Sequence, residues 1–266
     1  MHRKIVILLL LTAAVFQTVA QVDYSFGNIK KSHKIKNIPT VGIKGGLTFY
    51  NMKFSNKAYD KLPGENIQNI GYGVFGETPF GKNRNMSVSF ELMMIEKGMK
   101  KSFDHRGVQE INQINSKYID FRIPLTYYFM VSDYVNPYIF GAADIAFCYG
   151  GTDKVEYPNK EYEGSSIDIA NSDAVLKLFD LSVIAGAGVR FNIHFESFTM
   201  SVKLDASYNF GLLNVKSNVE GEPANIYAYY YDENNREKWY NRGLEVMLSV
   251  GIPLKFNKMN DLYYDW

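Results

Sequence analysis

The stretch FDLSVIAGAGVRF, residues 179–191, alternates between two kinds of side chain. The first set is apolar throughout and has an aromatic residue at each end: Phe179, Leu181, Val183, Ala185, Ala187, Val189 and Phe191. The second set is polar or small except at Ile184: Asp180, Ser182, Ile184, Gly186, Gly188 and Arg190. A period of two indicates a β-strand with one apolar and one polar face. Because its length is close to the ~9–11 residues of a tilted strand that crosses a bilayer, the stretch predicts a strand of a transmembrane β-barrel.

Seven further segments show the same alternation, so we expect eight strands in all. These segments are residues 40–50, 69–78, 86–95, 118–129, 137–148, 198–210 and 244–256. The connections alternate in length: 79–85, 130–136 and 192–197 are short, whereas 51–68, 96–117, 149–176 and 212–243 are long. Short periplasmic turns and long outer loops are typical of outer-membrane barrels. The predicted fold is therefore an all-β, eight-stranded antiparallel up-and-down transmembrane β-barrel, with both termini on the side of the short turns.

The composition agrees with one large β domain and limits the partners. The chain has 266 residues, is 46% hydrophobic and carries a formal net charge of +1. Because nucleic-acid binding relies on basic surfaces, this balance gives no reason to expect a nucleic-acid partner. The 20 tyrosines and 18 phenylalanines, against 2 tryptophans, favour membrane interfaces, where a ring lies half in water.

The first twenty residues have the pattern of a secretory signal peptide. Arg3 and Lys4 are basic, the next eleven residues are apolar, and a small-residue cleavage site ends at Ala20. The apolar run is shorter than the ~17–25 residues of a spanning helix, and no long apolar run follows it. We therefore expect a signal peptide at 1–20, an N-terminal arm at 21–39, the barrel at 40–256 and a tail at 257–266. The lysine-rich arm is either a solvated leader or a docking arm for periplasmic partners.

The polar faces of the predicted strands carry charges that point into the barrel. These residues are Lys44, Glu77, Glu91, Asp120, Arg122, Asp144, Asp180, Arg190, Lys203, Asp205 and Glu245. An eight-stranded barrel has an interior that side chains just fill, so we expect an ion-pair network rather than an open pore. A proton or ion path is the alternative. Because acids outnumber bases here and an unpaired buried charge is costly, some carboxylates must find water, hydroxyl groups or a proton.

Two residues need a special place in this fold. Pro124 falls inside a predicted strand, although proline has no N–H to donate to a β-ladder, so we expect a β-bulge there. Cys148 is the single cysteine, so it forms no intramolecular disulfide in an exported chain. We interpret it as a small residue at a strand end.

The last long connection, residues 212–243, is rich in large aromatic side chains. They are Tyr227, Tyr229, Tyr230, Tyr231, Trp239 and Tyr240. Exposed tyrosine and tryptophan are favoured anchors at interfaces, so the segment is a candidate binding surface for an envelope protein or a glycan. A hairpin that extends above the membrane and binds nothing is the alternative.

Signals for catalysis or metal binding are weak. The histidines lack the spacing of metal ligands, and the acidic residues of 149–176 lack the spacing of a calcium loop. The sequence SFDH, residues 102–105, holds nucleophile, acid and base types, but such a group arises easily by chance. We therefore expect no enzyme, no cofactor and no metal.

Short blocks of sequence resemble one family in their order along the chain. They are VGIKGGL (41–47), FEL (90–92) with EKG (96–98), YIDFRIPL (118–125), PYIFGA (137–142), GAGV (186–189) and GIP (251–253). Together they look like the PorT-like outer-membrane β-barrel proteins of the Bacteroidota, across residues 40–256. The resemblance implies an eight-stranded barrel in a family of mostly unassigned roles, with one member linked to a protein secretion system. The chain departs from it in the aromatic-rich last loop and in the tail, and Trp266 leaves the end of the eighth strand open.

These observations favour a monomeric barrel in the outer membrane of a Gram-negative bacterium, in contact with outer-membrane lipid. Its expected role is structural or interactive at the cell envelope, with a filled lumen and four long loops. One alternative is a soluble exported eight-stranded barrel that holds an apolar ligand, with the apolar faces turned inward. Another is a lipid-modifying outer-membrane enzyme that uses His105. The sequence does not identify the partner, the ligand or the physiological role.

Overall fold

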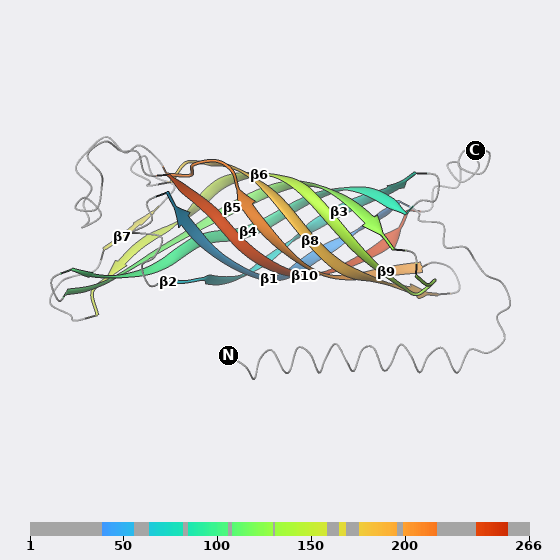
Figure 1. Cartoon of the computed structure of the whole chain (residues 1–266), viewed down its shortest axis with the longest axis horizontal. Helices are drawn as coiled ribbons and strands as arrows, with labels where there is room; N and C mark the ends of the chain where they lie inside the picture. The colour runs from blue at the N-terminus through green and yellow to red at the C-terminus, as the bar shows by residue number, and fades with distance from the viewer. Residues whose placement is uncertain are drawn as a thin grey trace. The chain divides into compact units, whose positions relative to one another are not determined.

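The computed structural model describes residues 39–55, 64–81, 85–105, 108–129, 131–158, 165–168, 176–195, 199–216 and 238–254. All regular structure within these ranges is β-strand (Figure 1). No helix in them is long and apolar enough to cross a membrane. The predicted signal peptide, most of the N-terminal arm and the C-terminal tail lie outside the described residues.

Eight strands form a closed ring. They are β1 (Thr40–Phe54), β3 (Ile67–Phe80), β4 (Met86–His105), β5 (Val108–Tyr128), β6 (Val135–Glu156), β8 (Phe179–His194), β9 (Thr199–Gly211) and β10 (Trp239–Pro253). Each ring strand pairs with the next one in an antiparallel ladder, and β1 closes the ring against β10 from Thr40 opposite Pro253 to Phe54 opposite Trp239. Two short strands, β2 (Gly64–Glu65) and β7 (Ser165–Asp168), pair with β4 and β6 outside the ring. The predicted eight-stranded antiparallel barrel is confirmed.

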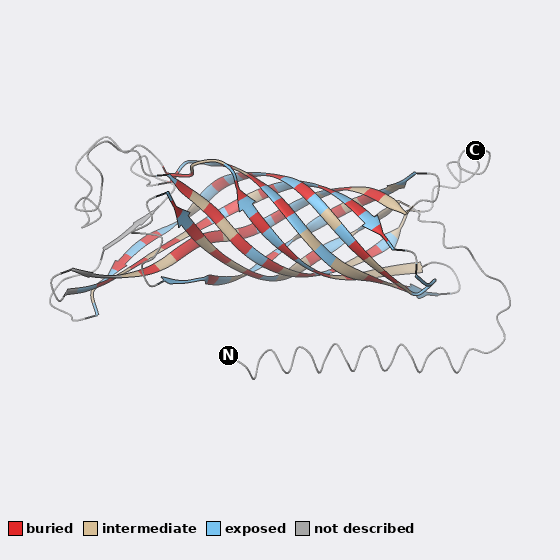
Figure 2. Ribbon diagram, viewed as in Figure 1, coloured by how far each residue is buried: buried red, intermediate tan, exposed pale blue. Residues whose placement is uncertain are grey.

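The two faces of each ring strand differ as the alternation predicts (Figure 2). Apolar side chains such as Ile43, Ile70 and Phe90 are about two-thirds exposed on the outer wall, whereas Asp120 and Asp144 are fully buried inside. An outer wall of this kind matches hydrocarbon and not water. The alternative of a soluble barrel with an apolar interior is therefore wrong, because the apolar faces point outward.

Phe75 is one of the large apolar residues that point inward instead of outward. Gly42 and Gly251 make room for its ring, because a Cβ on Gly42 would lie 2.7 Å from one ring carbon and a Cβ on Gly251 3.0 Å from another. The Lys203 ammonium lies 5.3 Å from the centre of the same ring. A large aromatic side chain can thus fill the narrow lumen where neighbouring strands carry glycine.

Three strands continue well beyond the apolar band. Residues 98–105 of β4, 108–117 of β5 and 150–156 of β6 form, with β2 and β7, a five-stranded antiparallel sheet that we call the sheet extension (Figure 1). Its outward side chains, such as Gln113, Asn115 and Lys154, are polar and at least partly exposed, whereas Met99 and Ile114 on the inner face are buried. The expectation that 96–117 is a loop is therefore wrong, because most of it is paired strand.

The short connections lie at the opposite end of the barrel from the sheet extension, together with the first residue of β1 and the last residue of β10. In one short turn, the Ser132 hydroxyl donates to the carbonyl of Val135 and accepts from the backbone N–H groups of Tyr134 and Val135. β10 ends at Pro253, three residues before the predicted end of the eighth strand.

Candidate functional site: the charged lumen

All of the lumen residues named from the sequence lie on the inner wall of the barrel. They come from every ring strand, so each strand contributes to one continuous polar interior. Two sets of contacts can be separated: one between the middle of the barrel and the sheet extension, and one nearer the short turns.

Arg122 on β5 is the centre of the first set. Its Nη1 donates to Oε2 of Glu245 at 2.7 Å and its Nη2 donates to Oε1 at 2.8 Å, which forms a two-bond fork across the lumen. The same Nη2 donates to Asp120 at 3.1 Å. The hydroxyl of Tyr50 donates to Glu245 as well. Both partners of the fork are fully buried, so the pair joins β5 to β10 through the interior.

Lys97 on β4 lies above this fork, toward the sheet extension. Its ammonium is 2.9 Å from Asp120, 3.4 Å from Asp144 and 3.9 Å from Asp180. It also lies 5.0 Å from the centre of the Tyr118 ring. Because one lysine faces three buried carboxylates, neutral hydrogen-bond donors are needed to complete the arrangement. They are the hydroxyl of Ser182 at 2.7 Å and the amide of Asn209 at 3.1 Å on Asp144, and the amide of Asn241 at 2.9 Å on Asp180.

The second set lies near the short turns. Lys203 on β9 forms an ion pair with Glu77 on β3, and the Tyr128 hydroxyl donates to the same carboxylate at 2.6 Å. The guanidinium of Arg190 lies over the Tyr128 ring at 3.9 Å from its centre. Close by, Lys44 on β1 is 3.2 Å from Glu91 and 3.8 Å from Asp205. These contacts connect strands that are not neighbours in the ring, so they fix the barrel across its diameter.

The lumen has little free space at this level. One cavity between Lys44, Glu91, Pro124, Tyr138 and neighbouring side chains has a volume of about 20 Å³, which is room for about one water molecule. The arrangement therefore holds charge in fixed positions and leaves no channel for solutes there. This geometry agrees with the expected filled lumen.

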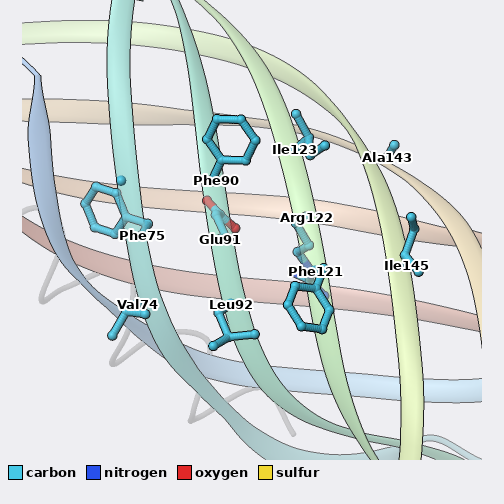
Figure 3. Close-up of a pocket in the computed structure, with 11 residues that line it drawn as sticks. Val74, Phe75, Phe90, Glu91, Leu92, Phe121, Arg122, Ile123, Ala143 and Ile145 are labelled. Carbon is cyan, nitrogen blue, oxygen red and sulfur yellow. The ribbon is translucent and has the colours of Figure 1, made fainter.

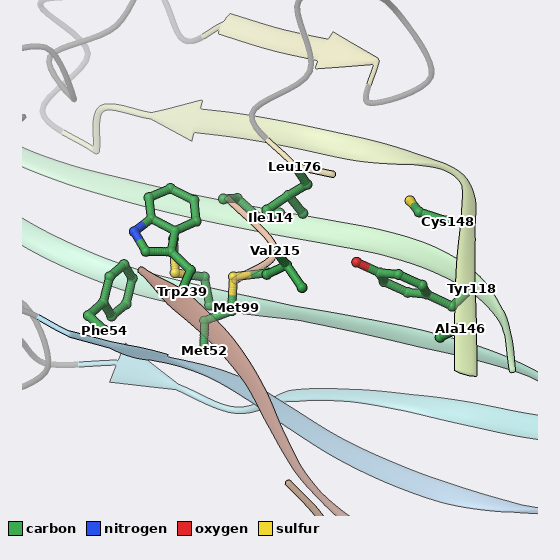
Figure 4. Close-up of a cluster of buried hydrophobic side chains, with 10 residues drawn as sticks. All are labelled: Met52, Phe54, Met99, Ile114, Tyr118, Ala146, Cys148, Leu176, Val215 and Trp239. Carbon is green, nitrogen blue, oxygen red and sulfur yellow. The ribbon is translucent and has the colours of Figure 1, made fainter. Parts of the chain in front are cut away.

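An apolar cluster lies above the charged sets, at the end of the barrel that carries the sheet extension (Figure 4). Trp239 is its largest member, and its ring packs edge-on against Phe54 at 5.4 Å between ring centres. Leu176 and Val215, which lie beside the ring strands, complete the cluster from segments that follow β7 and β9. The expectation that Trp239 is an exposed anchor is wrong, because it is the first residue of β10 and points inward at 2% exposure.

Several lumen residues escaped the sequence reasoning. Lys97 falls in the connection expected at 96–117, although it continues the inward parity of Glu91, Met93 and Ile95. With it, the membrane-spanning interior holds seven carboxylates and five cations among the described residues. Tyr50, Tyr128 and Tyr138 also point into the lumen, although the expected lumen set contains only charged residues.

Other expected site residues are placed only in part. Tyr227, Tyr229, Tyr230 and Tyr231 lie outside the described residues, and Tyr240 is half-buried on β10. His105 is the last residue of β4, and its side chain lies outside the described ones. Cys148 is a free, buried thiol near the end of the apolar band on β6. The described part of the chain contains no group of three or more histidine, cysteine, aspartate or glutamate side chains that fits a metal ion.

A closed ring with an apolar outer wall and a filled polar interior defines a small transmembrane β-barrel. A family model for the outer membrane protein beta-barrel domain matches residues 37–217. The chain therefore belongs to this family of outer-membrane β-barrels. No curated protein sequence matches the chain.

Solved structures of small outer-membrane proteins resemble the chain. Ail, the attachment invasion locus protein of Yersinia pestis, is 15% identical, with 82% of this chain and 99% of that chain covered at a TM-score of 0.34. Neisserial surface protein A is 11% identical, with 80% and 97% covered at a TM-score of 0.39. OprG from Pseudomonas aeruginosa is 10% identical, with 82% and 96% covered at a TM-score of 0.34. These values carry no functional information for this chain.

Proposed function

We propose that this protein is a non-enzymatic, closed barrel of the outer membrane that presents its sheet extension and long loops to an envelope partner. The filled lumen is the observation that carries the proposal. The fork between Arg122 and Glu245 crosses the interior, and the side chains of the apolar cluster around Trp239 are buried inside one end of the barrel. A protein built in this way acts through its surfaces and not through its interior.

The sheet extension supports an interactive role. It carries five strands beyond the apolar band, which is more ordered structure than a barrel needs to close its ends. Strand pairing makes it rigid, and a rigid surface loses less conformational entropy when it binds. We infer that it faces the cell exterior, because long segments lie outside in barrels of this class and short turns lie in the periplasm.

A protein is the partner that we propose, with a glycan as the other outcome of the test. The resemblance to PorT-like proteins supports a link to envelope assembly or secretion. The segment between β9 and β10 also carries Tyr227, Tyr229, Tyr230 and Tyr231, and tyrosine is a favoured anchor at interfaces. The barrel itself is proposed to act as a monomer, with a signal peptide that directs its export.

Conductance in planar bilayers tests the closed lumen. Purified protein that shows heat-modifiable migration on gels should give no large, stable conductance steps. Porin-sized steps that persist in a correctly folded sample would show that the interior conducts.

Site-specific photocrosslinking tests the partner. A photoactivatable amino acid at Gln113 of the sheet extension should give a discrete protein adduct in intact cells, whereas one at Asp133 in a short turn should not. Replacement of Tyr229 and Tyr230 by alanine should weaken the Gln113 adduct and leave membrane insertion unchanged. Equal adducts at both positions, or adducts that consist only of glycan, count against a protein partner at this surface.

A further inference from the structure

The ladder between β4 and β5 is interrupted in the middle of the barrel wall. The strands pair from Met86 opposite Tyr127 to Val88 opposite Leu125, and pairing resumes at Glu91 opposite Arg122. Two positions on each strand have no partner in the β4–β5 ladder. They are Ser89 and Phe90 on β4 and Ile123 and Pro124 on β5. The β5–β6 ladder remains continuous at the same height, with Pro124 opposite Ala142. No bulge forms at Pro124, contrary to expectation, because the register shift of β5 lies between Lys117 and Tyr118.

Pro124 accounts for the interruption. The backbone N–H of Tyr128 donates to the carbonyl of Asn85 on the β4 side, and the N–H of Phe129 donates toward Pro137 on the β6 side. Because N–H directions alternate along a strand, position 124 also faces β4. Proline has no N–H, so the bond toward Ser89 cannot form. The gap is therefore on the β4 side alone.

An apolar groove lies on the outer wall at this gap (Figure 3). It has a volume of about 330 Å³, within the ~300–1,000 Å³ range of small-molecule sites. Its walls come from four neighbouring strands, and the outward side chains that shape it are Val74, Phe90, Leu92, Phe121, Ile123 and Ile145. Gly76 and Ala143 leave the two sides open, and a Cβ on Gly76 would meet nothing within 4 Å.

The position of the groove determines what can occupy it. The outward apolar residues of β5 run from Ile119 to Tyr127, and Phe121 and Ile123 lie within this run. The groove therefore opens into hydrocarbon. Its charged lining residues, Glu91 and Arg122, point inward and are held by Lys44 and Glu245, so the groove offers no free cation to a carboxylate headgroup.

We propose that this groove binds one acyl chain of a bilayer phospholipid, whose headgroup stays at the membrane surface. A free fatty acid is disfavoured, because its carboxylate would have to enter hydrocarbon without a partner. The interrupted ladder lies at the groove between β4 and β5, and the small residues at 76 and 143 leave the sides of the groove open. The result is a defined lipid site rather than the even lipid contact of a uniform barrel wall.

Photolabelling in vesicles tests the site. The protein is refolded into phosphatidylcholine vesicles that contain a trace of phosphatidylcholine with a diazirine in one acyl chain, and the labelled peptides are mapped after illumination. We expect label to concentrate on the peptides of β4 and β5 that contain Phe90 and Phe121, several-fold above the opposite strands β9 and β10. Label spread evenly around the ring would overturn the proposal.

Two variants and one control separate binding from folding. Gly76→Leu adds a side chain to the groove at a position where a Cβ meets nothing within 4 Å, so it should lower the β4 and β5 label several-fold. Ala206→Leu adds a similar side chain on β9, where position 206 faces outward on the opposite side of the ring, and should leave the label unchanged.

Pro124→Ala restores the missing N–H and should also lower the label, without adding bulk to the outer wall. Unchanged label in both Gly76→Leu and Pro124→Ala would show that the groove does not select a chain. A parallel arm uses a free diazirine fatty acid in plain phosphatidylcholine vesicles. Stronger groove labelling by the free acid than by the phospholipid, at equal amounts in the vesicle, would contradict the proposed occupant.

Discussion

Arg122 shows what a buried charge contributes in this lumen. Its fork to Glu245 and its bond to Asp120 leave it almost no exposure. A buried ion pair is not by itself strongly stabilising, because desolvation offsets much of the attraction. The loss of one partner is costly, however, because it leaves an uncompensated charge in the interior. Mutation of one partner, and of both partners together, separates the net contribution of the ion pair from the cost of an uncompensated charge.

We predict that Arg122→Met lowers the free energy of unfolding by ~3–5 kcal/mol, since it leaves the buried carboxylate of Glu245 without its cation. Glu245→Met should cost a similar amount. The double variant should lose clearly less than the sum of the two, because no unpaired fork member remains. Guanidinium unfolding of the refolded barrel in vesicles measures all three. Simple additivity of the single effects would mean that the fork does not act as a unit.

Asp153 in the sheet extension provides a pH-dependent test. Burial raises the pKa of Asp153 from its ordinary value of 3.8 to about 6, and the charge of Glu110 adds to this. Neither carboxylate oxygen has a hydrogen-bond partner in the described part of the chain. Between pH 3.8 and about 6 the folded state therefore binds more protons than the unfolded state. Stability of the extension must then fall as pH rises through this window.

We predict that β6 amides beyond Gly150 are better protected from hydrogen exchange at pH 4.5 than at pH 7, after correction for intrinsic rates. Asp153→Asn should remove most of this difference. Glu156→Gln is the control, because Glu156 is exposed and hydrogen bonding to Lys154 lowers its pKa. A wild-type pH profile that persists in Asp153→Asn would exclude Asp153 as its source.

Parity along the strands predicted the lumen charges, because inside and outside alternate strictly in a membrane barrel. The same reasoning failed at Trp239. Its position in a long aromatic-rich segment indicated exposure, whereas β10 begins at this residue and turns it inward. No local pattern distinguishes an aromatic residue at a strand end from one in a loop.

At the scale of elements, the strands inside the membrane were predictable and their continuations were not. Within the membrane the outward face is apolar, but in the sheet extension the outward face includes Gln113 and Asn115. The inward face of the extension is mixed, with Met99 and Ile114 beside polar residues. A rule that searches for apolar outward residues therefore ends the strand where the outward face becomes polar, near Lys117.

The depth at which the outward residues of β10 lie in the bilayer gives a prediction at the scale of elements. Leu248 and Ile252 are equally exposed, at 51% and 52%, but Leu248 lies in the middle of the outward apolar run and Ile252 at its end near the short turns. Leu248→Arg should cost ~2–4 kcal/mol and Ile252→Arg about 0–1 kcal/mol. Guanidinium titration in vesicles measures both. Equal costs would contradict the assigned position of the bilayer.

At the scale of the whole molecule, the closed ring separates two ends of different character. One end has short turns such as that around Ser132, and the other has the sheet extension and the apolar cluster. The sequence predicted this asymmetry from connection lengths. It could not predict that three strands share one sheet, because the pairing of β5 with β6 joins residues such as Ile111 and Glu156 that are far apart along the chain.

The orientation of the two ends in the cell is the last prediction. We expect the sheet extension outside and the short turns in the periplasm. In a Cys148→Ala parent, Thr152→Cys in the extension and Asp133→Cys in a short turn each place one thiol at an exposed position. A membrane-impermeant maleimide applied to intact cells should label position 152 and not position 133, and both should react once the outer membrane is permeabilised. The unmodified protein is the control, because its single thiol is buried and should remain unlabelled. The reverse pattern of labelling would place the sheet extension in the periplasm, and the proposed partner would then have to be sought there.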